Sequence, residues 1–141
     1  MYGIDGSSGM LDRANKKGIY KETHELLLGI SEMPDHFKDK FDIACTAGCF
    51  NAGHFPDNSY EIMLTMVKVG GLLLCTMEDI YVDGQACGCD YKSNLDKLIA
   101  DKTVELVDRV KFKKYEGYDK EKSYGMFEEN GGSVLIIKKL K

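Results

Sequence analysis

The sequence lacks a long apolar run, and it lacks a basic stretch followed by an apolar region near its N-terminus. Its longest mostly apolar run, Gly70–Met77, is far too short to cross a bilayer. The first residues, Met1–Asp5, show no signal-like pattern, so nothing in them directs export. We therefore expect a cytoplasmic protein that does not span a membrane.

An excess of positive charge is also missing. The chain carries 19 Lys and Arg against 23 Asp and Glu, which gives a formal net charge of −4. A negative chain repels phosphate backbones, so nucleic acid is not an expected partner. The 141 residues are 43% hydrophobic and 30% charged, which is typical of a soluble globular protein. We predict one domain over residues 1–141.

The cysteines lack the pattern of a disulfide framework. They are odd in number, and they are Cys45, Cys49, Cys75, Cys87 and Cys89. Those in or beside apolar runs are typical of free, buried thiols in a reducing compartment. Cys87-Gly88-Cys89 has no second ligand pair at zinc spacing, so we predict no metal site.

Short apolar runs alternate with helical patterns along the chain. We expect strands at 2–4, 25–30, 41–46, 72–77, 104–112 and 133–138, and helices at 10–17, 59–69 and 93–102. Cap residues at Gly6–Gly9 begin the first helix, Asn58 and Glu61 form a capping-box pattern, and Gly70-Gly71 ends the second helix. This alternation predicts an α/β fold with a mostly parallel sheet. The last two strands have no helix between them, so we expect them to pair antiparallel.

Four motifs in this order resemble a known family. They are Gly3–Leu11, with a Gly-x-Asp at a strand end; Phe41–Gly48, a strand and its turn; Cys49–Pro56; and Lys68–Thr76, a Gly-Gly turn before a strand. Together they resemble the class I S-adenosylmethionine-dependent methyltransferases. Within that family, Cys49–Pro56 is most similar to the Williams–Beuren-region methyltransferase-like proteins. The resemblance implies a Rossmann-like sheet that ends in an antiparallel strand, with S-adenosylmethionine as cofactor.

The chain departs from this family in two places. Members begin with a strand and a glycine-rich loop that holds the amino-acid end of the cofactor, and this sequence has neither before Tyr2. We expect a domain truncated at its N-terminus that binds the cofactor poorly by itself. In addition, Leu27 stands where the family usually has an acidic residue near the adenine.

The resemblance implies a set of cofactor-binding residues, each of which also has an ordinary structural explanation. Asp5 would accept hydrogen bonds from the ribose hydroxyls, or it is a turn aspartate. Met10 would pack on the adenine, or it is a helix core residue. Leu27 and Leu28 would line the adenine pocket, although buried strand leucines are more common. The remaining candidates, Gly6 and Ala47, would let the backbone approach the cofactor, or they belong to ordinary turns.

The acceptor side has weaker candidates. Methyl transfer from a sulfonium needs the donor and acceptor held in line and away from water. His54, in the loop after the 41–46 strand, could take a proton from the acceptor, although a lone loop histidine is more often solvated. The aromatic residues of the long late loop would form a lid or belong to a surface loop, and they are Tyr115, Tyr118, Tyr124 and Phe127.

Three functional interpretations remain open from the sequence. The first is an S-adenosylmethionine-dependent methyltransferase whose acceptor is a small molecule or a protein. The second is a non-catalytic interaction protein that keeps the scaffold and pairs with a partner strand. The third, a nicotinamide-binding domain, is disfavoured by the Gly70-Gly71 turn and the antiparallel ending.

Overall fold

The structure is a computed structural model, and it describes residues 1–113 and 131–141. Contacts divide the chain into two compact units, Met1–Asp35 and His36–Lys141, which are described separately below. The predicted aromatic residues of the late loop, Tyr115, Tyr118, Tyr124 and Phe127, lie outside the described residues. None of the helices described is long and apolar enough to cross a membrane.

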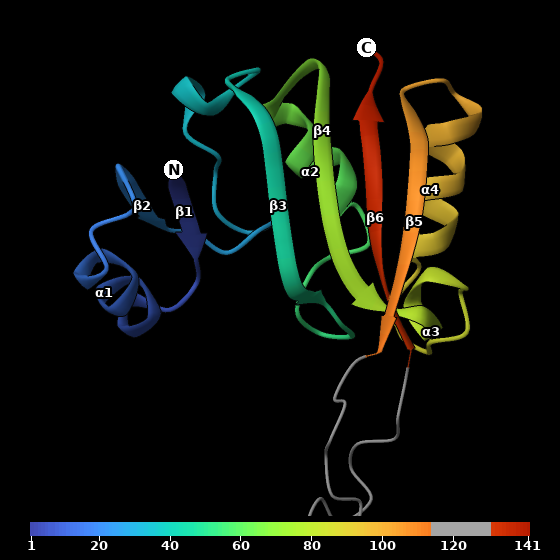
Figure 1. The fold of residues 1–141 in the computed structure, drawn as a ribbon, viewed down its shortest axis with the longest axis horizontal. Helices are drawn as coiled ribbons and strands as arrows, with labels where there is room; N and C mark the ends of the chain where they lie inside the picture. The colour runs from blue at the N-terminus through green and yellow to red at the C-terminus, as the bar shows by residue number, and fades with distance from the viewer. Residues whose placement is uncertain (114–130) are drawn as a thin grey trace, which may run out of the picture. The chain divides into compact units, whose positions relative to one another are not determined.

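The first unit is a small β-α-β arrangement. Strand β1 (Tyr2–Asp5) pairs in parallel with β2 (Glu22–Glu25), and helix α1 (Ser8–Lys16) connects them (Figure 1). Ser7 caps the helix as expected, because its hydroxyl accepts the Met10 amide at 3.3 Å. Leu11 is the buried residue of the helix.

The strand predicted at 25–30 is wrong by several residues. Strand β2 occupies Glu22–Glu25, and the Leu26 amide makes the last contact, a 3.1 Å hydrogen bond to the Asp5 carbonyl. Because β1 ends at Asp5, no backbone remains to pair with the apolar run beyond that point. The run instead turns, and Leu27 is 53% exposed.

The second unit is a four-stranded sheet in the order β3-β4-β6-β5. Its strands are β3 (Phe41–Phe50), β4 (Val67–Glu78), β5 (Val104–Lys113) and β6 (Gly131–Lys139). Strands β3 and β4 are parallel, and β6 is antiparallel to both β4 and β5. This mixed sheet confirms the predicted α/β class and the antiparallel ending.

Helices cover one face of this sheet. Behind it in Figure 1 lie α2 (Ser59–Met66) and α4 (Tyr91–Ala100), and the short α3 (Asp79–Val82) lies at its end after β4. A 3-10 turn, η1 (Asp35–Phe37), precedes β3. The core on the covered face consists mainly of Leu73, Cys75, Leu135 and Ile137 from the sheet, with Tyr60, Met63, Tyr91 and Leu98 from the helices.

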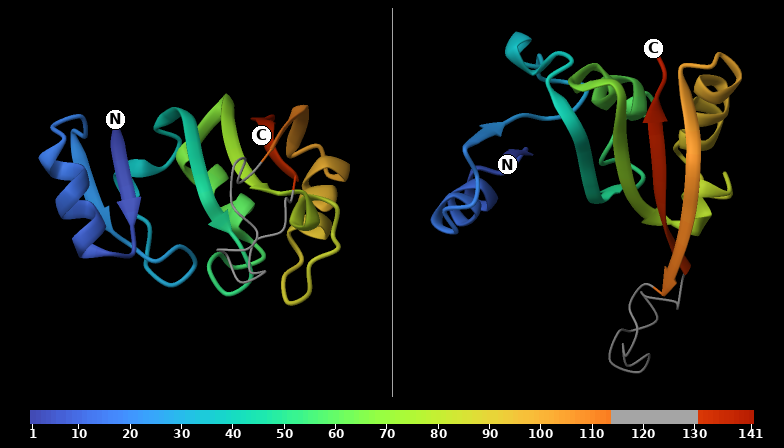
Figure 2. Two further views of the ribbon diagram at one scale, coloured as in Figure 1. Left: turned by 60° about the horizontal axis from the view of Figure 1, so that its bottom comes forward. Right: turned by 45° about the horizontal axis from the view of Figure 1, so that its top comes forward.

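The opposite face is half open. Ile43, Val110 and Phe112 are 55%, 47% and 38% exposed, and none of the helices described for this unit lies in front of the sheet in Figure 2. Among the described strands, β3 is hydrogen-bonded on one side only, to β4, and β1 is hydrogen-bonded on one side only, to β2. Buried parallel strands normally have both faces covered, so this open face is a notable feature of the unit.

The Gly70-Gly71 pair does not end helix α2. The helix ends at Met66, and β4 begins at Val67, so both glycines lie inside the strand. Between the β3–β4 pairs Phe41–Val67 and Ile43–Leu72 the register shifts, and Gly70 supplies the required φ of +84°. A Cβ on Gly71 would lie 2.7 Å from the Asp42 carbonyl oxygen, which only glycine avoids.

Two smaller expectations were also wrong. Asn58 occupies the cap position of α2, but its side chain makes no capping hydrogen bond. Ser59 makes a side-chain hydrogen bond at this helix start instead, because its buried hydroxyl donates to the Pro56 carbonyl at 2.5 Å. Strand β3, expected to stop at Thr46, continues through Ala47 to Phe50 along β4.

Candidate functional site

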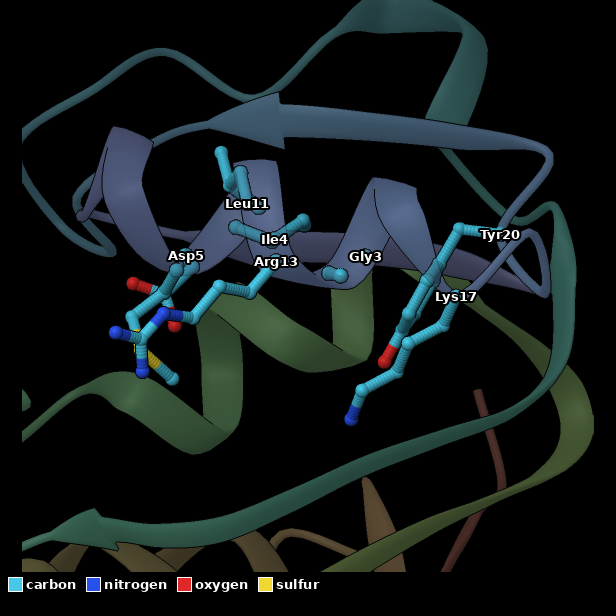
Figure 3. A pocket seen from close by; sticks show the side chains of 9 residues that line it. Gly3, Ile4, Asp5, Leu11, Arg13, Lys17 and Tyr20 are labelled. Carbon is cyan, nitrogen blue, oxygen red and sulfur yellow. The ribbon is translucent and has the colours of Figure 1, made fainter.

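A pocket of about 470 Å³ lies along β1 and α1 in the first unit (Figure 3). Its walls are side chains of the helix face, and its base is the backbone of β1. The lining residues are Gly3, Ile4, Asp5, Met10, Leu11, Arg13, Ala14, Lys17 and Tyr20. Two of the predicted cofactor residues, Asp5 and Met10, are thus brought into one pocket.

Asp5 has two separable tasks. Its Oδ1 accepts the Ser7 amide at 2.8 Å, which forms the turn that leads into α1. Its other carboxylate oxygen accepts no hydrogen bond from the described residues. One oxygen therefore organises the turn, while the second is available to a ligand in the pocket.

Met10 is not a core residue of the helix. It is 54% exposed and lines the pocket, whereas Leu11 beside it is 8% exposed and takes the core position. The thioether therefore offers an apolar, polarizable surface on the pocket wall.

The remaining predicted residues do not line the pocket. A Cβ on Gly6 would lie 2.4 Å from Cδ2 of Leu27, so the bare glycine makes room for that side chain. Leu27 and Leu28 lie in the turn after β2 rather than in a strand. Ala47 belongs to the second unit, in β3.

The second unit carries a fixed loop at the carboxyl end of β3. The Tyr91 hydroxyl lies 2.6 Å from the Phe55 carbonyl oxygen and 3.0 Å from that of Asn51, so its proton is shared between the two ends of the loop. The Tyr81 hydroxyl accepts the Ala52 amide at 3.4 Å. Two helices of this unit thus hold the loop Asn51–Pro56 by its backbone.

Aromatic rings also pack around Phe50, the residue that precedes this loop. The Tyr91 ring is 1% exposed and meets the Phe50 ring edge-on, with centroids 5.0 Å apart. Phe50 also stacks on Tyr60 at 4.9 Å. Burial raises the pKa of Tyr91 to about 12, so its hydroxyl stays neutral and remains a proton donor.

His54 lies within this loop and is exposed. Its amide donates to the Asn51 carbonyl at 3.0 Å, while its ring makes no hydrogen bond within residues 1–113 or 131–141. A solvated imidazole on a fixed backbone can accept a proton from a bound group. The role of His54 as a base stays a prediction.

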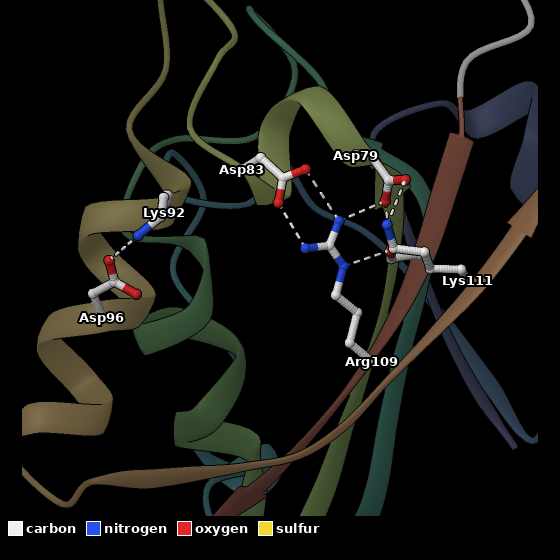
Figure 4. Close-up of polar contacts among 7 residues, drawn as sticks. Asp79, Asp83, Lys92, Asp96, Arg109 and Lys111 are labelled. Atoms are coloured by element: carbon white, nitrogen blue, oxygen red, sulfur yellow. Dashed lines mark hydrogen bonds and ion pairs between the residues drawn. The ribbon is translucent and has the colours of Figure 1, made fainter.

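A charged cluster joins β5, β6 and α3 near the end of β4 (Figure 4). Arg109 donates to Asp83 at 2.6 Å, to Asp79 at 2.8 Å and to the Ser133 hydroxyl at 2.8 Å. The fully buried Ser133 in turn donates to Asp79 at 2.5 Å. The cluster therefore ties three elements together.

The charges of this cluster shift its titration. Burial raises the pKa of Asp79, but hydrogen bonds from Ser133 and Arg109 outweigh burial, so the net pKa is lowered. The hydrogen bond from Arg109 lowers the pKa of Asp83, and both carboxylates raise that of Arg109. All three groups are thus charged at neutral pH.

Sequence reasoning missed Tyr91 and Arg109. Tyr91 reads locally as a helix residue after its cap Asp90, and its partners at Asn51 and Phe55 lie 40 and 36 residues away. Arg109 meets Asp79 only because β6 lies between β4 and β5. The strand order would have been the signal, and it is not visible in local patterns.

Comparisons with known proteins agree on the fold. No protein-family profile matches the chain. Over 76 residues, 54% of the chain, it is 33% identical to Methyltransferase-like protein 27 of Homo sapiens, and the match spans 30% of that protein's length.

Two solved structures extend this comparison. The N-methyltransferase NodS of Bradyrhizobium japonicum has a TM-score of 0.62 and 13% identity, over 99% of this chain and 73% of NodS. A SAM-dependent methyltransferase from Thiobacillus denitrificans, in complex with S-adenosyl-L-homocysteine, has a TM-score of 0.52 and 14% identity, over 98% and 75% of the two chains. The chain therefore has the class I methyltransferase fold, which confirms the expectation from its motifs.

Proposed function

We propose that the protein is an S-adenosylmethionine-dependent methyltransferase and that Asp5 is the ribose-binding carboxylate of its cofactor site. The observation that carries the proposal is the position of Asp5, at the carboxyl end of a parallel strand, with one carboxylate oxygen available to the pocket. In open α/β sheets ligands bind outside the carboxyl ends of the strands, and an acidic residue there accepts ribose hydroxyls. The partial identity to a methyltransferase-like protein supports the same assignment.

The residues present fit the nucleoside part of this cofactor. Asp5 can accept two hydroxyl protons, and the exposed thioether of Met10 suits the face of a flat base. S-adenosylmethionine supplies a methyl group on a good leaving group, so the protein has chiefly to hold donor and acceptor in line. Gly6, Leu27, Leu28 and Ala47 remain proposed contacts outside the pocket lining.

On the acceptor side we place the loop Asn51–Pro56. Its backbone is held by the hydroxyls of Tyr81 and Tyr91, and His54 on this loop is the proposed base that takes a proton from the acceptor. The acceptor is proposed to be a small molecule or a protein, since a net charge of −4 disfavours nucleic acid. The five free cysteines support a reducing, cytoplasmic location.

A second candidate function has its own support. The face of the sheet that carries Ile43, Val110 and Phe112 is half open, and β3 presents one edge without a neighbour among the described strands. Exposed apolar faces and strand edges are typical of interaction surfaces. A non-catalytic protein that docks a partner on this sheet would bind no cofactor.

Titration with S-adenosylhomocysteine, followed by amide chemical shifts of the chain, separates the two. We expect weak binding, with a dissociation constant of about 100 µM or higher, and shifts at Asp5 and Met10. Asp5→Asn keeps an acceptor for the Ser7 amide but weakens the ribose contact, so binding should fall about tenfold. Asp12→Asn, the same change of charge on helix α1 outside the pocket, is the matched control.

The result against methyl transfer is equally definite. A folded chain whose amides do not respond to S-adenosylhomocysteine, or respond equally in wild type and Asp5→Asn, favours the interaction protein. The search would then turn to partners of the open sheet face.

A further inference from the structure

The two edges of the second unit's sheet differ in charge. Among the described strands, β3 lies at one edge and β5 at the other (Figure 1). Strand β5 carries charged side chains along its length, and they are Glu105, Asp108, Arg109, Lys111 and Lys113. Strand β3 carries no charged residue from Ile43 to Phe50. Charged side chains protect natural edge strands from pairing with another chain, so β5 has this protection and most of β3 lacks it.

The regular part of β3 runs from Ile43 to Ala47. Its residues pair one to one with Leu72–Thr76 of β4, and the register shifts on both sides of this stretch. A register shift interrupts strand pairing, whereas a regular stretch repeats its backbone donors and acceptors evenly and can pair with a further strand. Cys45 is the middle residue of the stretch. A strand added along this edge would therefore be centred on Cys45.

Antiparallel pairing of this stretch with its own copy matches large side chains with small ones and keeps like charges apart. A two-fold axis at Cys45 would place Ile43, which is 55% exposed, opposite Ala47 of the second copy. Asp42, the charged residue next to the stretch, would lie opposite Gly48 of the second copy and not opposite its own copy. The edge of β3 is therefore compatible with itself.

We propose that β3 pairs antiparallel with β3 of a second copy of this chain, with a two-fold axis at Cys45. A two-fold contact brings the same surface of both copies together, so a charge at the axis would face its like. The regular part of β3 has no charge, whereas the same contact through the middle of β5 would bring Asp108 or Arg109 against its own copy. The sheet of one copy thus continues into that of the other through β3. The proposal does not rest on methyl transfer or on cofactor binding.

Sedimentation equilibrium on the 141-residue chain tests the association. We expect the mass to rise from monomer to dimer with protein concentration, as mass action requires. Ile43→Lys puts a charge on the β3 edge and should weaken self-association about tenfold. Val110→Lys, on the same open face but in β5, is the matched control and should dimerise as the wild type does. Both side chains are exposed, so circular dichroism should report an unchanged fold.

Crosslinking tests the register of the pairing. Directly opposite residues of an antiparallel pair have Cβ atoms about 5 Å apart, so the two Cys45 thiols would come within reach of a disulfide. Oxidation with copper phenanthroline should therefore yield a covalent dimer joined at Cys45. This dimer should be lost in Cys45→Ser and kept in Cys87→Ser, a change at another exposed cysteine.

Three outcomes would overturn the proposal. One is a monomer at every concentration, and another is an equal loss of association in Ile43→Lys and Val110→Lys, which would assign the effect to the open face or to net charge. The third is a dimer that crosslinks through Cys87 and not through Cys45. A parallel titration with S-adenosylhomocysteine keeps the proposed function separate, because that ligand can bind or fail whatever the association result.

Discussion

Replacement of Lys139 by methionine should strongly destabilise the second unit. The Lys139 ammonium group donates to the carbonyl oxygens of Leu64 and Val67, both at 2.9 Å, and to Asp39 at 2.7 Å. Its side chain is 12% exposed, so water replaces these bonds poorly. It joins the last strand to the end of α2 and the start of β4.

The size of the effect follows from the two carbonyl bonds. A hydrogen bond from a charged donor contributes about 1.5 kcal/mol or more, and both carbonyls belong to buried residues. The Leu64 carbonyl keeps one other donor, the Val67 amide. Methionine keeps most of the apolar stem, so little packing is lost. We therefore expect a loss of about 3 kcal/mol, to which the solvent-screened pair with Asp39 adds little.

Urea denaturation followed by circular dichroism measures this loss. With a slope of about 2 kcal/mol per molar urea, the midpoint should fall by about 1.5 M. Lys68→Met is the matched control, because Lys68 pairs with Asp42 on the surface, and its midpoint should not change measurably. An equal shift in the two variants, or none in Lys139→Met, would refute the argument from buried carbonyls.

Two further outcomes follow from the contacts of the second unit. Tyr91→Phe keeps the ring but removes the hydroxyl proton that the Asn51 and Phe55 carbonyls share. Amide exchange of Ala52 and His54 should therefore accelerate about tenfold without a matching fall in global stability. Unchanged exchange would show that the hydroxyl does not fix the loop. The lowered pKa of Asp79 implies stability that is present above its unfolded pKa and lost as pH falls through its folded pKa. The denaturation midpoint should therefore fall less between pH 5 and pH 3 in Asp79→Asn than in the wild type. An identical acid profile in the two proteins would contradict this.

The elements that local patterns specify were predicted well. Ser7 caps α1 because a hydroxyl there meets a free amide three residues on, and the alternation of strands and helices fixes the α/β class. Boundaries that depend on a partner were not predicted. The Leu26–Leu28 run has strand composition, but none of the described strands pairs with it, since β1 ends at Asp5. Likewise, the local sequence around Gly70 predicts a turn, whereas in the structure Gly70 lies at the register shift where β4 pairs with β3.

The residues of the candidate site also divide into those that a local pattern predicts and those that depend on contacts between distant elements. The position of Asp5 in a pocket could be predicted, because it depends on a local pattern, a carboxylate at the end of a strand before a helix. The contacts of Tyr91 required the strand order to be known, because they join elements far apart in the chain.

The fold leaves the chemistry open, since one scaffold hosts many reactions and the structural relatives share about one residue in seven with this chain. The contact proposed for Asp5 concerns the ribose alone, so it does not identify the group that the ribose carries, and the titration with S-adenosylhomocysteine is what tests that group.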